Sequence, residues 1–404
     1  NEHRIKGGLS VNKYHFEPGV IEPATDSSSI VTFNMRDKFA YETALFLQDE
    51  WKVSERLLVK AGLRWSSFHR MGADTIVVYE DDAPIRYDSM LGQYVNGEVV
   101  DSLFYGPNDV VKSYSNLEPR LSVRYQIDES RSVKASYQKI NQYLHLITNA
   151  SSPTPLDIWA PSGPFIKPLM GQQYALGYFY ISDNKKWELS SELYYKNLDN
   201  VIDYVDGADL EFNNHLETEI LYGQGRAYGL EFMLEKKLGK LTGWMSYTFA
   251  KTESLIPGNG LDDPGINHGD WYPNPQDKTH DLSLVAFYKL NPKWSFSSNF
   301  VFATGIPTNY PVAKYEYEGI MIPHYSGSRN QERLENYHRL DFAATYKPRG
   351  NDLREWVFSI YNAYNRKNAS SLYFRESIDN SGQTEAIQLS IFPIVPSVSY
   401  NFRF

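Results

Sequence analysis

The chain contains 404 residues, of which 42% are hydrophobic, and it carries a net charge of −9 and no cysteine. The absence of cysteine excludes a disulfide scaffold and a thiolate metal site, and the acidic balance argues against a nucleic-acid partner, which requires a basic surface. No run of about 18 apolar residues occurs, so a helical membrane span is excluded as well. A soluble protein and a transmembrane β-barrel both remain, because only alternate residues of a barrel strand face lipid.

Apolar and polar residues alternate in segments along the whole chain, and this period-2 pattern predicts about fourteen β-strands, the first over residues 4–14. In residues 117–128, Leu121 and Val123 share one face of the strand, whereas Glu118, Arg120 and Arg124 share the other. The same separation of charge recurs in residues 57–67, 187–196 and 294–302. Each strand therefore has one face for an apolar medium and one for a polar medium.

The connections between these strands alternate in length. Short turns rich in turn-forming residues lie near 54–56, 128–131, 183–186, 238–240, 291–293 and 349–352. Long segments lie between them, near 17–39, 71–113, 144–167, 200–219, 254–276, 306–332 and 367–384. This alternation is typical of outer-membrane barrels, which have tight periplasmic turns and long extracellular loops. A large soluble all-β protein such as a propeller is the alternative, but blade repeats are not found in the sequence.

Two groups of aromatic residues on the strands support a membrane barrel. Tryptophans lie within a few residues of short turns, as an interfacial girdle requires, at Trp51, Trp187, Trp294 and Trp356. In the last segment, residues 397–404, alternate aromatic residues end on a terminal phenylalanine. The segment resembles the closing strand of bacterial outer-membrane barrels, and this resemblance implies that the signal read by the barrel-assembly machinery consists of Tyr400, Phe402 and Phe404.

Charged residues on the polar parity of the strands should point into the barrel lumen. They are Lys60, Arg64, Glu118, Arg120, Arg124, Glu188, Glu192, Glu231, Arg339, Asp341 and Arg403. So many ionised groups require water or a polar plug around them, because an unpaired buried charge costs several kcal/mol. Two interpretations stay open: the charges pair with one another or with a plug, or they contact a substrate directly.

Aromatic residues in the long segments are candidates for substrate binding, since rigid amphipathic rings bind sugars, peptides and flat chelates. The candidates are Trp159, Phe165, Trp271, Tyr272, Tyr310 and Tyr325. Packing between loops is the alternative role for these rings.

No catalytic constellation is found, and the sequence predicts no enzyme, cofactor or metal site. The glycines at Gly223, Gly225 and Gly229 lack the spacing and the helix of a dinucleotide fingerprint. His268 and His280, each close to an aspartate, fit a polar loop that runs into a strand better than a metal cluster.

Several segments, in this order, resemble TonB-dependent receptors, particularly those of the Bacteroidetes type. They are Tyr41–Leu63, Asn116–Ser122, Gly225–Glu231, His280–Ser283 and Tyr361–Arg366. The resemblance covers essentially the whole chain. It implies a transmembrane antiparallel up-and-down β-barrel in the outer membrane of a Gram-negative bacterium, with about fourteen strands here of about twenty-two. Residues 1–404 would then be the C-terminal part of the barrel, and the plug domain, the TonB box and the first strands would lie outside this chain.

The resemblance also implies a function and partners. The expected function is binding and active import of a scarce nutrient, namely a ferric chelate, an oligosaccharide or a peptide. The expected partners are outer-membrane lipid, TonB through the absent N-terminal part, the barrel-assembly machinery and, as a further candidate, a surface lipoprotein. The alternative is a passive pore or a scaffold barrel within a larger outer-membrane complex.

Overall fold

The computed structural model describes residues 2–23, 25, 32–147, 158–210, 213–258, 262–317, 320–325, 327–350, 353–377 and 383–403. Phe404, the last residue of the expected assembly signal, lies outside the described residues. No helix in the described part of the chain is long and apolar enough to cross a membrane.

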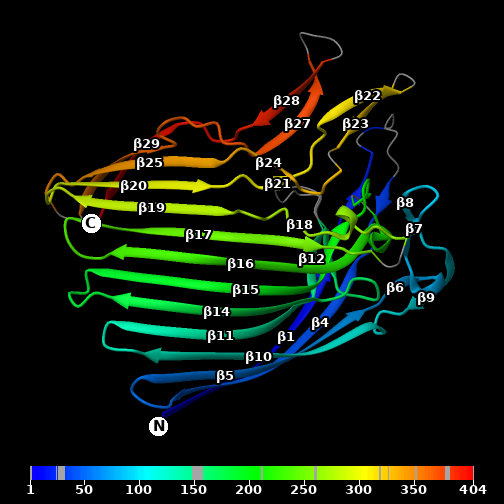
Figure 1. The fold of residues 1–404 in the computed structure, drawn as a ribbon, viewed down its shortest axis with the longest axis horizontal. Helices are drawn as coiled ribbons and strands as arrows, with labels where there is room; N and C mark the ends of the chain where they lie inside the picture. The colour runs from blue at the N-terminus through cyan, green and yellow to red at the C-terminus, as the bar shows by residue number, and fades with distance from the viewer. Residues whose placement is uncertain are drawn as a thin grey trace.

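One large antiparallel sheet dominates the fold (Figure 1), and its strands pair in chain order. The fourteen long strands are β1 (Glu2–Phe16), β4 (Lys38–Lys52), β5 (Leu57–Met71), β10 (Val110–Gln126), β11 (Arg131–Gln142), β14 (Leu169–Ile181), β15 (Trp187–Tyr204), β16 (Ile220–Lys236), β17 (Leu241–Leu255), β19 (His280–Lys289), β20 (Trp294–Ala303), β25 (Tyr337–Tyr346), β26 (Arg354–Tyr361) and β29 (Val395–Phe402). A short strand, β18 (Tyr272–Pro273), pairs with β17. The predicted all-β, up-and-down architecture of about fourteen strands is confirmed.

The connections at the two ends of the sheet differ as predicted. Figure 1 shows tight turns at the end that carries both chain termini, and the larger loop elements at the other end. Side chains close these turns: one carboxylate oxygen of Asp128 accepts hydrogen bonds from the backbone N–H groups of Ser130 and Arg131, each at 2.9 Å. Asn291 does the same for Lys293 and Trp294. Such local hydrogen bonds explain why these short polar segments turn the chain.

The register assigns each side chain to a face, because residues directly opposite in an antiparallel pair point to the same side. The register from β5 to β25 places Lys60, Glu192, Glu231 and Tyr337 on the same face of the sheet. Ten of the eleven predicted lumen charges lie on this face within the strands, and Arg403 follows β29 on the same parity. The opposite face exposes large apolar side chains, among them Leu117, Leu176, Leu193, Leu230 and Phe342.

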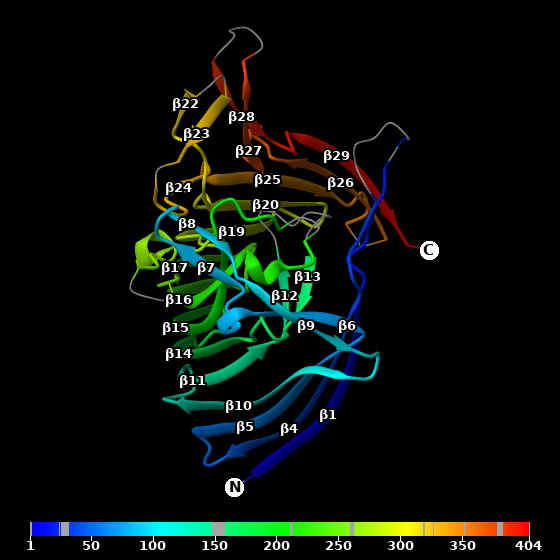
Figure 2. The same cartoon turned by 90° about the vertical axis from the view of Figure 1, so that its right-hand side faces the viewer.

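The polar face is the inner face of a curved sheet. Figure 2 shows the sheet curling round β12 (Leu144–Ile147) and β13 (Ile158–Pro161). Tyr143, just before β12, places its hydroxyl 2.8 Å from Ser66 Oγ on the polar face of β5. Among the described residues, β1 pairs with β4 and with no other strand, and β29 pairs with β26 alone. The two edge strands are therefore not joined to each other.

The loop end contains small elements that the sequence analysis did not predict. They are β2 (Val20–Ile21), β3 (Phe33–Asn34), β6 (Asp74–Tyr79), η1 (Glu80–Asp82), β7 (Ile85–Asp88), β8 (Gln93–Asn96), β9 (Val99–Tyr105), η2 (Leu216–Thr218), η3 (Asn267–Gly269), β21 (Pro307–Thr308), β22 (Ala313–Tyr317), β23 (Ile320–His324), β24 (Glu332–Arg333), β27 (Ser371–Glu376) and β28 (Thr384–Leu389). The buried apolar clusters lie largely here; one contains Ile147, Ile158 and Leu216, and another contains Ile256 and Ile266. The buried apolar side chains are thus packed mainly among the elements at the loop end, and less against the inner face of the sheet.

Candidate functional site

The inner face carries a polar cluster around Arg64. Its guanidinium donates to Glu42 at 2.9 Å and lies 3.6 Å from the carboxylate of Glu118. Glu118 is only 4% exposed, and its other oxygen accepts a hydrogen bond from Ser66 at 2.8 Å. Arg120 approaches the same carboxylate at 3.9 Å. The buried charge of Glu118 is therefore compensated by neighbours on the wall itself.

Other predicted inner charges also pair along the wall. Lys60 contacts Glu50 at 2.6 Å, and Glu188 contacts Lys237 at 2.6 Å. Lateral pairing favours the structural interpretation of these charges over direct contact with a substrate.

Near the C-terminal end of the sheet, Arg339 contacts Asp341 at 3.0 Å and donates to the hydroxyls of Tyr337 and Tyr361. This group again compensates a wall charge through neighbours on the same face. Arg124 and Arg403 are exposed on that face.

A hollow of about 310 Å³ in the inner wall brings together predicted residues from three strands. Lys60 of β5, Arg120 of β10 and Glu192 of β15 line it, together with Gln138 and Gln173. Glu231 lies directly opposite Glu192 in the register. The wall at this level is thus polar and of mixed charge, which suits water or another polar surface against it.

A larger pocket of about 670 Å³ opens among the long loops, within the usual size range of ligand sites. Its aromatic lining comes from three separate loops, with Tyr87 and Tyr94 in the first, His268 in the second, and Tyr310 and Tyr325 in the third. Rings from distant segments therefore meet around one concave space, and we name this space the loop pocket.

Tyrosine hydroxyls at the loop pocket are held as donors by nearby carboxylates. Tyr94 donates to Asp263, and Tyr310 donates to Glu332 at 3.3 Å. Burial and the neighbouring carboxylate raise the pKa of both phenols above the ordinary value. Both hydroxyls therefore stay protonated at neutral pH and remain hydrogen-bond donors.

Arg329 lines the loop pocket, and two carboxylates neutralise it. It contacts Asp203 and Asp206 at 2.9 Å each, while Tyr272 donates to Asp203 at 2.5 Å. Burial, followed by the charge of Asp203, raises the pKa of Tyr272. This network links the third loop to the end of β15, so it shapes the pocket and leaves little unpaired positive charge for an anion.

The predicted loop aromatics fall into different environments. Tyr310 and Tyr325 line the loop pocket, and Phe165 lines a neighbouring hollow of about 620 Å³. Tyr272 is 0% exposed, so in this structure it offers a ligand no surface and serves as a buried anchor.

The two predicted tryptophans lie outside this group. The Trp271 ring stacks 4.1 Å from the guanidinium of Arg226, and Trp159 in β13 is 52% exposed. Trp271 therefore packs against Arg226, whereas about half of the Trp159 side chain is exposed.

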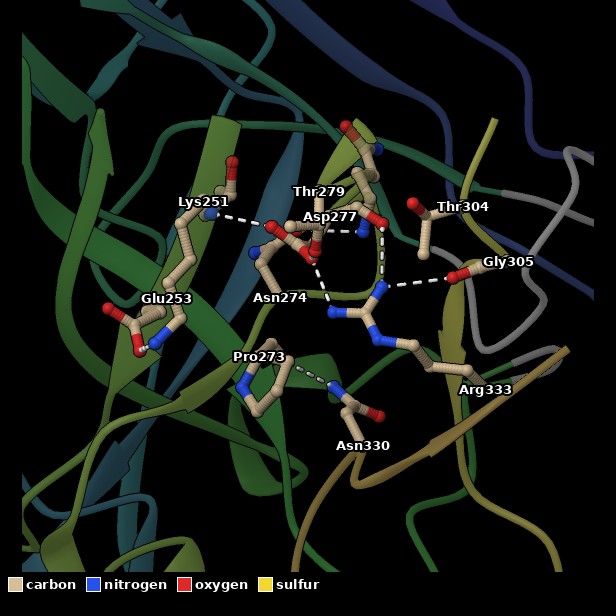
Figure 3. Close-up of polar contacts among 12 residues, drawn as sticks. Lys251, Glu253, Pro273, Asn274, Asp277, Thr279, Thr304, Gly305, Asn330 and Arg333 are labelled. Carbon is tan, nitrogen blue, oxygen red and sulfur yellow. Dashed lines mark hydrogen bonds and ion pairs between the residues drawn. The ribbon is translucent and has the colours of Figure 1, made fainter. Parts of the chain in front are cut away.

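A polar network anchors two of the long loops to the sheet (Figure 3). Asp277, which is 1% exposed, accepts a hydrogen bond from the backbone N–H of Thr252 at 2.7 Å and contacts Arg333 at 2.5 Å. Arg333 also donates to the carbonyl of Gly305 at 2.9 Å. The side chain of Asn330 adds a bond to the carbonyl of Pro273 at 2.9 Å. The two loops are thus fixed to strand β17 and to the segment that directly follows β20.

Several of these residues were not predicted from the sequence, for different reasons. Glu42 lies on the polar parity of β4, so the alternation rule would have found it. Asp277, Arg329 and Arg333 lie in segments without periodicity, and no local signal identifies their partners.

Comparisons with known proteins agree with this geometry. The family model described as "TonB dependent receptor-like, beta-barrel" matches residues 2–365. Among solved structures, the chain is similar to the closed form of the ferric-catecholate import receptor Fiu from E. coli K12, with a TM-score of 0.62, 14% identity, and coverage of 100% of this chain and 52% of that chain.

Two further structures show the same fold. The siderophore receptor PiuA from Acinetobacter baumannii has a TM-score of 0.60 and 15% identity, and the match covers 98% of this chain and 52% of that one. The ferripyoverdine receptor of Pseudomonas aeruginosa has a TM-score of 0.57 and 12% identity, with coverage of 98% and 45%. The chain therefore spans about half the length of these proteins. A comparison with curated proteins finds no match. Because the family model matches most of its length, the chain belongs to the TonB-dependent receptor β-barrel family of the Gram-negative outer membrane.

Proposed function

We propose that this chain forms the C-terminal part of the barrel of a receptor that captures a scarce nutrient and imports it with energy from TonB. The match of the family model to residues 2–365 carries this proposal. Members of this family are transporters and receptors rather than enzymes, and they act with TonB. The loop pocket supplies a concave, aromatic-lined space in which a nutrient would first bind.

The rest of the barrel would come from outside these 404 residues. Among the residues that the structure describes, no strand pairs with the edge of β1 that faces away from β4 or with the edge of β29 that faces away from β26, and an unpaired backbone group in hydrocarbon costs several kcal/mol. Further strands would pair with both edges and close a barrel of about twenty-two strands. A plug inside would then meet the polar inner wall, whose charges already pair laterally.

The proposed cargo is a ferric chelate, an oligosaccharide or a peptide, with ferric chelates as the first class to test. The names of the structural neighbours support this order, since they include a ferric-catecholate import receptor and a ferripyoverdine receptor. The flat tyrosine rings of the loop pocket suit all three classes.

The further partners follow from the same proposal. TonB would act through an N-terminal part, and the barrel-assembly machinery would read the C-terminal aromatics Tyr400, Phe402 and Phe404. A surface lipoprotein is a candidate for covering the loops.

Uptake in the native bacterium tests this function. Cells with and without the gene would receive labelled ferric chelates, oligosaccharides and peptides, in the presence or absence of a protonophore. The proposal predicts that one class accumulates only with the gene and only without the protonophore, while surface binding survives the protonophore. Gene-dependent uptake that persists with the protonophore would favour a passive pore, and no gene-dependent binding or uptake of any class would favour a scaffold barrel.

A further inference from the structure

Three metal-ligating side chains meet on the outer side of the sheet, where β1 ends and β4 begins. They are His15, Glu17 and Asp37, and their ligand atoms all lie within 4.8 Å of one another. Among the residues that the structure describes, this is the one group of three or more such residues close enough to share an ion. None of the three residues lines the loop pocket, so the group is distinct from the nutrient site proposed above.

The backbone brings these residues together. His15 is opposite Phe39 in the register, and the last pair of the two strands is Phe16 with Lys38. Glu17 directly follows the last residue of β1, and Asp37 directly precedes the first residue of β4. His15 is therefore held by strand pairing, and the two carboxylates lie at the ends of the connecting loop next to that pairing.

The imidazole of His15 is already oriented toward both carboxylates. Its ring stacks on Phe39 with centroids 4.5 Å apart and an interplanar angle of 14°. Its Nε2 atom lies 2.8 Å from Asp37 and 3.6 Å from Glu17. Stacking limits rotation of the ring, so Nε2 already points at both carboxylates, and an ion bound there would replace the Nε2 proton that now bonds to Asp37.

The charges at this place favour a cation. The carboxylates of Glu17 and Asp37 lie close together just beyond the ends of two neighbouring strands, and like charges at this distance repel. A divalent ion would remove this repulsion and would take one nitrogen and two oxygen ligands, leaving a fourth position for water. That set suits Zn²⁺, whereas Ca²⁺ and Mg²⁺ prefer oxygen ligands alone.

We infer that His15, Glu17 and Asp37 form a Zn²⁺ site on the outer surface of the barrel, at the loop end, which ties the end of β1 to the start of β4. All three side chains are at least partly exposed, so an ion reaches them directly from the medium. Bound metal would stabilise this edge of the sheet, because it binds the folded pair of strands and not the separated ones.

The chain offers a matched control at the other end of the same two strands. His3 of β1 lies 2.6 Å from Asp49 of β4, and its ring stacks on Trp51. This pair has the same imidazole, carboxylate and aromatic partner, but among the described residues no third ligand lies close enough to complete a group of three. His3→Gln therefore removes a comparable imidazole without touching the inferred site.

The test is a Zn²⁺ titration of the chelator-treated, purified protein in detergent, by calorimetry and by competition with a coloured zinc indicator. Co²⁺ absorption reports the coordination geometry independently. The wild type and His3→Gln should bind one Zn²⁺ that His15→Gln and Asp37→Asn bind on the order of tenfold more weakly or not at all. The Co²⁺ spectrum of a low-coordinate site should disappear only in these two variants.

Equal Zn²⁺ stoichiometry and affinity in the wild type, His15→Gln and Asp37→Asn would overturn the inference. Displacement of Zn²⁺ by equimolar Ca²⁺ or Mg²⁺ would overturn it too, because these ions prefer oxygen ligands and would show that the imidazole does not bind the metal. Because the substituted side chains are exposed, the variants should fold, and resistance of the barrel to unfolding in detergent without heating checks that they do.

Discussion

The guanidinium of Arg333 lies 2.5 Å from the carboxylate of Asp277, and this contact joins two long loops that are separate in the sequence. Asp277 is almost fully buried and is also bonded to the backbone of β17 through Thr252. The pair therefore holds the two loops together and to the sheet. Its loss should loosen the loops while leaving the sheet in place.

Removal of Arg333 should open the loops locally. Arg333→Gln leaves the buried carboxylate of Asp277 without its cation, which should lower the local stability by about 1 to 3 kcal/mol. Hydrogen exchange should then rise in residues 304–317 and 327–336 and remain unchanged in β14 and β15. Arg366→Gln is the control, because its carboxylate partner Glu335 is 59% exposed whereas Asp277 is buried, so this pair should contribute little. Equal exchange in the two variants would show that the contact does not hold the loops.

The polar cluster of the inner wall makes a second prediction. Arg64→Gln removes the cation shared by Glu42 and Glu118, so the free energy of unfolding should fall by about 1 to 3 kcal/mol. Arg124→Gln is matched in charge, face and chemistry, but Arg124 is exposed, and it should cause little change. Urea-dependent unfolding in detergent measures both variants. A loss of the same size in Arg124→Gln would mean that wall charge as a whole, rather than the Arg64 cluster, sets the stability.

Acid should loosen the loop unit formed by β12 and β13. Burial lowers the pKa of His145 from its ordinary value of 6.5 to about 4, and its ring contacts Ser162 at 3.1 Å. The folded unit therefore favours neutral His145, so its stability is complete above pH 6.5, falls as the pH drops towards 4, and levels off below that. The whole change is about 3 kcal/mol.

The measurement is hydrogen exchange of residues 144–147 and 158–162 from pH 7 to pH 4, corrected for the intrinsic exchange rates. His145→Gln keeps a polar group and cannot titrate, so its protection should not show this pH dependence. A parallel decline in the wild type and the variant would assign the effect to other groups.

The orientation of the barrel can be tested with single cysteines, because these 404 residues contain none, and the protein without the added cysteine measures the background. A cysteine at Asp101, which is exposed in β9 at the loop end, should react with a membrane-impermeant thiol reagent on intact cells. A cysteine at Glu129, exposed in a short turn, should react only after the outer membrane is opened. Labelling of Glu129→Cys on intact cells, with Asp101→Cys protected, would reverse the topology.

The sequence predicted the sheet well because a barrel strand obeys a strict local rule. Each residue of a strand such as 187–196 faces one of two media, so the alternation of Glu192 and Leu193 is readable without any knowledge of the fold. The short turns are equally local, as Asp128 and Asn291 show.

The loop end could not be predicted in the same way. The burial of Tyr272 depends on Asp203, which is 69 residues away, and the Asp277–Arg333 contact spans 56 residues. Contacts of this kind follow from the packing of several loops, for which the sequence contains no period. Both Tyr325 and Tyr272 were therefore predicted as binding candidates from the same feature, an aromatic residue in a long segment, although Tyr325 lines a pocket and Tyr272 is buried.

The central claim is that one face of this sheet contacts lipid and the other contacts a polar lumen, and a pair of adjacent residues tests it most directly. Leu193 is 57% exposed on the apolar face, and Glu192 lines the inner hollow beside it on β15. Folding into phospholipid vesicles, followed by urea titration, should show that Leu193→Arg costs about 2 to 4 kcal/mol near the bilayer midplane, whereas Glu192→Arg costs much less. Equal losses at the two positions would contradict the account, because they would show that neither face of the strand meets hydrocarbon.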